Sequence, residues 1–131
     1  MQLMPRTAAE MGRDRRFRRG KGRDALFNPK INIELGSKYL SHLMYNGDKV
    51  RNLFKTLAAY NAGPGKLGRW ESTINYQNDP LMFMESIPSP ETRNFIEQVF
   101  IGLWIYRFRL DQPAPSLTQL AEGNWPHYKS V

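Results

Sequence analysis

The chain has 131 residues, 40 % of them hydrophobic and 24 % charged, which is the size and composition of one compact folded domain. It contains no cysteine, which excludes disulfides and thiolate metal sites, and its two histidines, His42 and His127, do not suggest zinc. We therefore expect no metal and no cofactor. The longest apolar stretch, residues 99–106, is too short to span a membrane, and the first residues lack the pattern of a signal peptide.

Most of the net charge of +7 lies near the N-terminus, because eight of the 19 Lys and Arg residues fall between Arg6 and Arg23. Three glycines interrupt this segment and predict a loop over residues 13–23. Such a loop is either a solvated connection between helices or a contact for a polyanion. Phe17 is its only aromatic residue and no nucleic-acid-binding motif is present, so we expect no nucleic acid partner.

Hydrophobic residues recur at helical spacing along nearly the whole chain, which predicts an all-α fold. Asn28 followed by proline predicts the start of a helix that ends near Asn46. Asp48 is the expected cap of a second helix, which the sequence Gly63-Pro64-Gly65 ends. Residues 68–79 have no clear periodicity.

Ser89 followed by proline predicts the longest helix, over residues 90–110. The Pro-containing tail, residues 111–131, is expected to pack on the preceding domain. Within it, Ser116 with Gln119 suggests a capping box for a short helix that ends at Gly123.

Four ordered blocks resemble one known family: MQLMP at 1–5, residues 28–40 from NP to YL, AYNAGPG at 59–65, and the segment from Glu85 to Arg93 with its IP and ETR motifs. This pattern is similar to the catalytic domain of soluble lytic transglycosylases, the SLT type, whose fold is related to goose-type lysozyme. The resemblance covers residues 1–110. Four motifs in the right order are far more specific than any one of them.

The resemblance implies an enzyme of the bacterial periplasm or cell envelope that acts on peptidoglycan glycan strands. Such enzymes cleave the β-1,4 bond between N-acetylmuramic acid and N-acetylglucosamine without water, giving a 1,6-anhydro sugar. One glutamate acts first as acid and then as base. A carboxyl that stays protonated near neutral pH requires an apolar, dehydrated pocket.

The resemblance also suggests substrate-binding residues: Gln2, Tyr60, Asn61 and Glu91. For Tyr60 and Asn61 we favour an exposed pair that hydrogen-bonds sugar, whereas the alternative is that Asn61 caps a helix and Tyr60 packs. Glu91 would lie in the first turn of the long helix, where the dipole favours its charged form and disfavours a role as general acid. We expect Glu85 and Arg93 to form an ion pair. For Trp70, Trp104 and Trp125 we favour positions in the core or a lid over a sugar platform, and Trp70 is the best candidate for the exception.

The family's catalytic glutamate lies upstream of the block with which this sequence opens. Hence no catalytic residue is identified. Glu85-Ser86 has the residue types of the Glu-Ser pair that carries the family's catalytic glutamate, but it lies in the closing motif and not on that earlier helix. We expect an N-terminally truncated domain, inactive alone, that self-associates through uncovered apolar faces on Leu53, Leu57 and Phe100. The alternative function is a non-catalytic peptidoglycan- or polyanion-binding module that uses residues 13–23.

Overall fold

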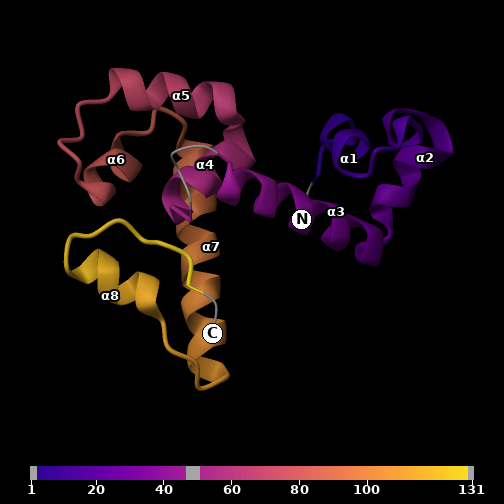
Figure 1. Ribbon diagram of the computed structural model, residues 1–131. Coiled ribbons are helices and arrows are strands. Elements are labelled where there is room, and N and C mark those ends of the chain that lie inside the picture. Colours follow the sequence, from indigo (N-terminus) through magenta and orange to yellow (C-terminus); the bar gives the residue numbers. More distant parts are fainter. Residues whose placement is uncertain (1–2, 47–50, 130–131) are drawn as a thin grey trace. The chain divides into compact units, whose positions relative to one another are not determined.

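The computed structural model describes residues 3–46 and 51–129, and these are helical nearly throughout, which confirms the all-α prediction. The elements in chain order are α1 (Pro5–Met11), η1 (Arg15–Arg18), α2 (Gly20–Asp24), η2 (Ala25–Phe27), α3 (Pro29–Tyr45), α4 (Leu53–Ala62), α5 (Pro64–Thr73), α6 (Pro80–Ser86), α7 (Pro90–Arg109) and α8 (Pro115–Ala121). They form two compact units, Met1–Leu43 (unit 1) and Met44–Val131 (unit 2), each shown in Figure 1.

Unit 1 packs α1, η1 and α2 against the first turns of α3 (Figure 1). Its small core contains Leu3, Ala8, Leu26 and Leu35, with Met11, Phe17, Ile31 and Tyr39 packed around them. The predicted start of α3 is confirmed, because the Asn28 side chain accepts a hydrogen bond from the backbone N–H of Lys30 at 3.0 Å.

The basic segment is helical, whereas the sequence predicted a loop over residues 13–23. It forms the short helices η1 and α2, and two of its glycines allow close packing. A Cβ on Gly22 would lie 2.0 Å from the carbonyl oxygen of Arg16, and one on Gly12 would lie 2.9 Å from the Phe17 ring. The glycines therefore hold η1 tightly between its neighbours, where the sequence suggested flexibility.

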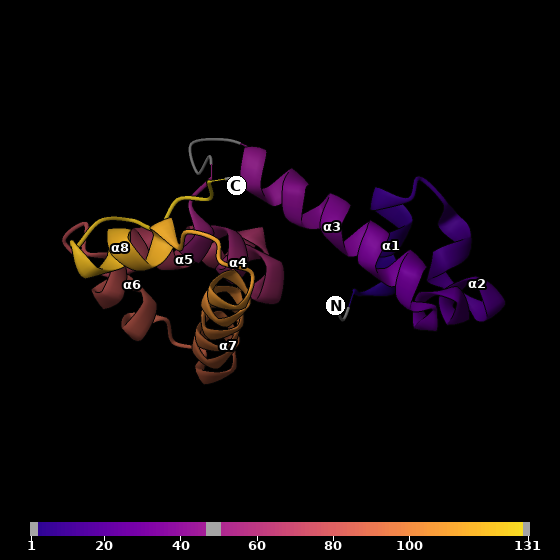
Figure 2. The same cartoon turned by 90° about the horizontal axis from the view of Figure 1, so that it is seen from below.

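Unit 2 is built around the long helix α7, which Figure 2 views almost end-on, with α4 and α8 above it and α6 to its left. The predicted cap of α7 is confirmed, since the Ser89 hydroxyl accepts the backbone N–H of Thr92 at 3.2 Å. Ile96 and Phe100 of α7 are fully buried, and the Phe100 ring meets the Phe54 ring of α4 with centroids 4.9 Å apart.

The helix α4 begins later than predicted. Asn52 is its N-cap and accepts the backbone N–H of Lys55 at 3.1 Å, whereas the expected cap, Asp48, lies outside the described residues. The break after α4 is confirmed: Gly63 has φ +93°, a conformation that favours glycine. The chain does not enter a loop there, because Pro64 starts α5 directly, and α5 covers much of the stretch that showed no periodicity.

The tail is held to unit 2 by side chains of the main body. The buried guanidinium of Arg107 donates hydrogen bonds to the carbonyl oxygens of Pro113, at 2.7 Å, and of Lys129, at 3.0 Å. The predicted capping box at Ser116 is wrong. Ser116 lies inside α8, buried, and its hydroxyl accepts the indole N–H of Trp104 at 3.0 Å.

The apolar faces that we expected to be uncovered are buried, since Leu53, Leu57 and Phe100 are each less than 10 % exposed. That part of the prediction is wrong because α4 and α7 cover one another. Other side chains of α7 are left at the surface instead, and they are Ile101, Ile105, Tyr106 and Phe108.

Candidate functional site

Two motifs that lie far apart in the sequence meet where α4 ends and α7 begins. The Thr92 hydroxyl donates a hydrogen bond of 2.7 Å to the side-chain oxygen of Asn61, and its own oxygen lies 3.0 Å from the Ser89 hydroxyl. Thr92 is 1 % exposed, while Asn61 is half-buried. Thus the AYNAGPG and ETR segments form one hydrogen-bonded edge, and Asn61 is oriented by α7.

Tyr60 lies beside this edge with its ring stacked on the ring of Phe95, at a centroid distance of 6.1 Å and an interplanar angle of 5°. The residue is half-buried, and its phenol oxygen is enclosed by protein. The expected exposed Tyr-Asn pair is therefore only partly accessible. The Tyr60 hydroxyl is enclosed, so of this residue only part of the ring can be accessible.

Glu91 is exposed in the first turn of α7, directly after Pro90 at the first helical position. Its carboxylate therefore stands at the positive end of the helix dipole. The ion pair expected between Glu85 and Arg93 is not formed in the described part of the chain. Arg93 instead donates to the carbonyl oxygen of Ile87, and Glu85 is exposed on α6.

Two further sequence candidates do not extend this edge. Gln2 lies outside the described residues. Trp70 is 7 % exposed and belongs to the core of unit 2, so it offers no face to a sugar. The residue that the sequence did not single out is Thr92: it belongs to the ETR motif, but nothing in the sequence indicated its contact with Asn61.

No carboxyl side chain in the described ranges 3–46 and 51–129 is buried. Hydrogen bonds from Arg16 hold the pKa of Asp14 below its usual value, and a hydrogen bond from Lys38 does the same for Glu34. Both shifts favour the ionised form. A general acid that stays protonated near neutral pH needs the opposite environment.

The described residues contain neither a metal-binding cluster nor a membrane-spanning helix. No group of three or more His, Cys, Asp or Glu side chains lies close enough together there to hold a metal ion. None of the described helices has both the length and the apolar character needed to cross a membrane.

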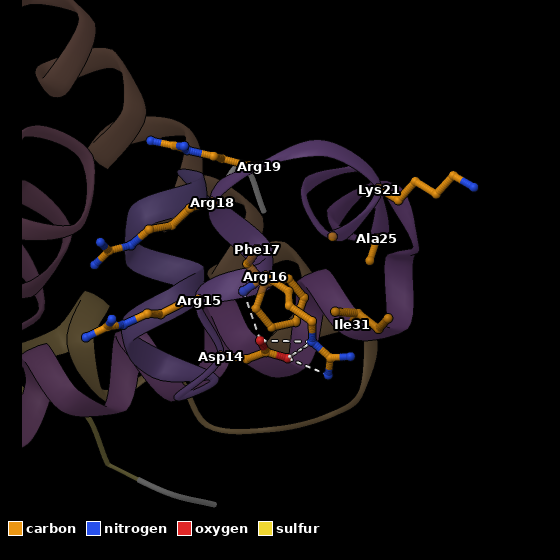
Figure 3. A pocket seen from close by; sticks show the side chains of 10 residues that line it. Asp14, Arg15, Arg16, Phe17, Arg18, Arg19, Lys21, Ala25 and Ile31 are labelled. Atoms are coloured by element: carbon orange, nitrogen blue, oxygen red, sulfur yellow. Dashed lines mark hydrogen bonds and ion pairs between the residues drawn. The ribbon is translucent and has the colours of Figure 1, made fainter.

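A second candidate site lies in unit 1, where η1 and α2 enclose a hollow of about 810 Å³. Five cationic side chains line it, together with Asp14. Arg16 binds Asp14, with its Nη2 2.8 Å from a carboxylate oxygen (Figure 3). Figure 3 shows Arg15, Arg18 and Arg19 extending together to the other side of η1. Those three form no ion pair among the described residues.

Comparison with known proteins gives matches along the chain. The family model of the transglycosylase SLT domain matches residues 1–83. The soluble lytic murein transglycosylase of Salmonella typhimurium is 34 % identical over 112 residues, which is 86 % of this chain. The enzyme of that name from Escherichia coli K12 is 33 % identical over 114 residues, and a putative one from Haemophilus influenzae is 32 % identical over 124.

These matches cover only part of the relatives. The chain spans 17 % of the length of the Salmonella and Escherichia coli proteins and 20 % of the Haemophilus influenzae protein. No solved structure gives a significant match.

Proposed function

Because this chain belongs to the transglycosylase SLT domain family, we propose that it acts on the glycan strands of peptidoglycan, in the periplasm or cell envelope. The reaction is cleavage of the β-1,4 bond between N-acetylmuramic acid and N-acetylglucosamine. The observation that carries the proposal is the contact between Asn61 and Thr92, which joins two of the family-like motifs into one edge.

The chemistry requires one carboxyl group that moves a proton twice. The acid gives its proton to the glycosidic oxygen as the bond from that oxygen to C1 breaks. The resulting carboxylate then takes the proton of the C6 hydroxyl, whose oxygen bonds to C1 and closes the 1,6-anhydro ring. Water does not enter, and the second carboxylate of ordinary glycosidases is not needed.

The described residues supply binding groups for this reaction. We propose that Asn61 donates its amide N–H groups to sugar oxygens, since its carbonyl oxygen is already taken by Thr92. Glu91, exposed at the helix start, would accept hydrogen bonds from sugar hydroxyl or acetamido groups. Tyr60 would contribute the edge of its stacked ring, and Gln2 remains a candidate on its motif position alone.

We propose that the chain by itself binds glycan but does not cleave it, because every described carboxyl is exposed or half-buried. Glu97 lines an apolar hollow with Phe100 and Trp104, but its side chain is exposed. The test is incubation with purified sacculi, followed by mass spectrometry for anhydromuropeptides. We expect none. Products that disappear in Glu91→Gln would contradict this expectation and identify Glu91 as the acid.

Binding is tested separately by co-sedimentation of the chain with insoluble peptidoglycan. Asn61→Asp keeps an oxygen for Thr92 but removes the amide donors, so we expect about five- to tenfold weaker binding, the worth of one or two hydrogen bonds. Glu85→Gln, which removes an exposed carboxylate from α6, is the matched control and should bind normally. Equal binding by both variants would exclude the α4–α7 edge.

The hollow beside η1 supports a second candidate function, a non-catalytic module that holds an anionic polymer of the cell wall. Arg15, Arg18 and Arg19 extend together from one packed helix and have no carboxylate partner among the described residues. Retention on sacculi across a salt series tests it. Replacing these three arginines with Gln should remove the salt-sensitive part of the binding, and unchanged retention would reject it.

Self-association is still proposed, because apolar side chains are left at the surface. The residues are not Leu53, Leu57 and Phe100, which are buried, but exposed side chains of α7. The exposed apolar side chains of α7, among them Ile105 and Phe108, offer a surface for a second copy. Light scattering after gel filtration tests this, and a monomer at high concentration would reject it.

A further inference from the structure

Three polar side chains form a short chain of hydrogen bonds where α4 ends and α7 begins. The Ser89 hydroxyl oxygen lies 3.0 Å from that of Thr92, and the Thr92 hydroxyl donates to the side-chain oxygen of Asn61 at 2.7 Å. Thr92, in the middle, is 1 % exposed, while Ser89 and Asn61 are half-buried at the two ends. The chain therefore runs from the cap of α7, through a buried hydroxyl, to the side chain proposed above to bind sugar.

The direction of these hydrogen bonds decides which end of the Asn61 amide faces outward. A hydroxyl group has one hydrogen, so Thr92 donates either to Ser89 or to Asn61. If it donated to Ser89, its oxygen would be left to accept from Asn61, whose amide nitrogen would then point inward and whose carbonyl oxygen would point outward. If it donates to Asn61, the amide N–H groups are left to face a ligand.

The distances favour the second direction. Hydrogen bonds from a hydroxyl to an oxygen are usually about 2.7 Å long and those from an amide N–H about 2.9 Å, so the 2.7 Å contact fits donation by Thr92. Ser89 supports this direction. Its oxygen already accepts the backbone N–H of Thr92 at 3.2 Å, so its own hydrogen can point to the Thr92 oxygen.

We propose that Ser89 is a positioning residue that sets the hydrogen-bond polarity of the sugar-binding edge. By donating to Thr92, it leaves the Thr92 hydrogen for Asn61 and keeps the Asn61 amide donors outward. The edge is then selective for ligand groups that present acceptor oxygens. This inference rests on the proposed role of Asn61 in glycan binding. Because Ser89 also caps α7, a loss of stability alone would not distinguish the two roles.

The substitution Ser89→Asp separates the cap from the polarity. A carboxylate accepts the backbone N–H of Thr92 as a hydroxyl does, and its charge suits the positive end of the helix dipole, so we expect an unchanged or higher melting temperature. The carboxylate has no hydrogen to donate, and it attracts the Thr92 hydroxyl hydrogen in a charge-assisted bond. The Asn61 amide should then turn over, so that its nitrogen donates to Thr92 and its carbonyl oxygen faces outward.

The first measurement needs no glycan. It is hydrogen exchange of the Asn61 side-chain amide, followed by NMR. In the unsubstituted chain Thr92 holds the amide oxygen, so the amide hydrogens should exchange rapidly. In Ser89→Asp one of them is bound to Thr92 and should exchange about tenfold more slowly, the worth of one hydrogen bond. Equal rates in the two chains, or slow exchange in the unsubstituted one, would overturn the inference.

The second measurement is co-sedimentation with insoluble peptidoglycan. Ser89→Asp should bind about five- to tenfold more weakly, because the amide donors are turned inward. Ser89→Gly is tolerated at a helix cap and leaves both amide orientations open, so binding should fall about twofold. Ser89→Thr keeps a hydroxyl and should bind normally. The charge control is Asn94→Asp, which adds a carboxylate at an exposed position of α7 and should also bind normally.

A double substitution shows whether Ser89 acts through Asn61. In an Asn61→Ala background no amide remains to be turned, so Ser89→Asp should cause no further loss of binding. A further loss there, or an equal loss in Asn94→Asp, would show that the added charge acts directly and would overturn the inference. If the unsubstituted chain binds no peptidoglycan, the proposed function fails, and slower exchange in Ser89→Asp still supports control of the amide by Ser89.

Discussion

Thr92 offers the sharpest test of the proposed glycan-binding edge. Thr92→Val keeps the shape of the side chain but removes the hydroxyl that donates to Asn61 at 2.7 Å. Thr92 is 1 % exposed, so the Asn61 oxygen loses a partner that lies on its buried side. Leaving such a group unsatisfied costs about 2 kcal/mol, which for a unit of this size lowers the melting temperature by roughly 10 °C.

The same substitution should weaken glycan binding about fivefold, because the Asn61 amide is no longer held in one orientation before the sugar arrives. Thr92→Ser is the matched control: it keeps the hydroxyl and removes one buried methyl group, at a cost of about 1 kcal/mol. The two assays are thermal unfolding followed by circular dichroism and co-sedimentation with peptidoglycan. If the Ser variant lost as much affinity as the Val variant, packing rather than orientation would explain the site, and our reasoning would fail.

Three further predictions concern the stability of the fold. Gly22→Ala should destabilise unit 1 by about 2 kcal/mol, because the new Cβ would lie 2.0 Å from a carbonyl oxygen. Gly68→Ala lies inside α5 with open space around it and should stabilise unit 2 by about 0.5–1 kcal/mol; urea denaturation measures both changes. Arg107→Met should cost about 3 kcal/mol and speed amide exchange in the tail, whose two carbonyls lose their donor, and the exposed Arg109→Met should do neither. Burial, aided by the charge of Glu10, raises the pKa of Tyr39 above its usual 10.0. The folded state then holds the proton more tightly than the unfolded state, so the stability present below pH 10 should fall as the pH rises further. Denaturation at about pH 9 and pH 11 measures this fall, and Tyr39→Phe should lack the contribution of Tyr39 to it.

The helices with clear signals at both ends were predictable from the sequence. Asn28 and Ser89, each followed by proline, mark the starts of α3 and α7, and both caps are present as hydrogen bonds. Gly63 marks the end of α4 for an equally local reason, its positive φ. In each case a side chain or a backbone angle within a few residues fixes the boundary, so no distant contact is needed to place it.

Boundaries set by distant contacts were not predictable. Ser116 has the spacing of a cap, but burial against Trp104 takes its hydroxyl for the indole N–H. The glycines of the basic segment suggested flexibility, although Gly22 serves close packing against Arg16. A glycine allows both a flexible turn and a tight contact, and only the position of the neighbouring helix decides between them.

In the candidate site, too, the residues were predictable from the sequence but their long-range contacts were not. Its members were named from motifs, but the bond between Asn61 and Thr92 joins residues 31 positions apart and changes what each of them does. With its carbonyl oxygen already accepting from Thr92, Asn61 offers chiefly its two amide N–H donors, which suits the many acceptor oxygens of a glycan strand. The described carboxylates are exposed or half-buried, so they too can accept hydrogen bonds. A carboxyl that stays protonated near neutral pH needs burial, whereas a group that hydrogen-bonds sugar needs access, so the two roles make opposite demands on one side chain.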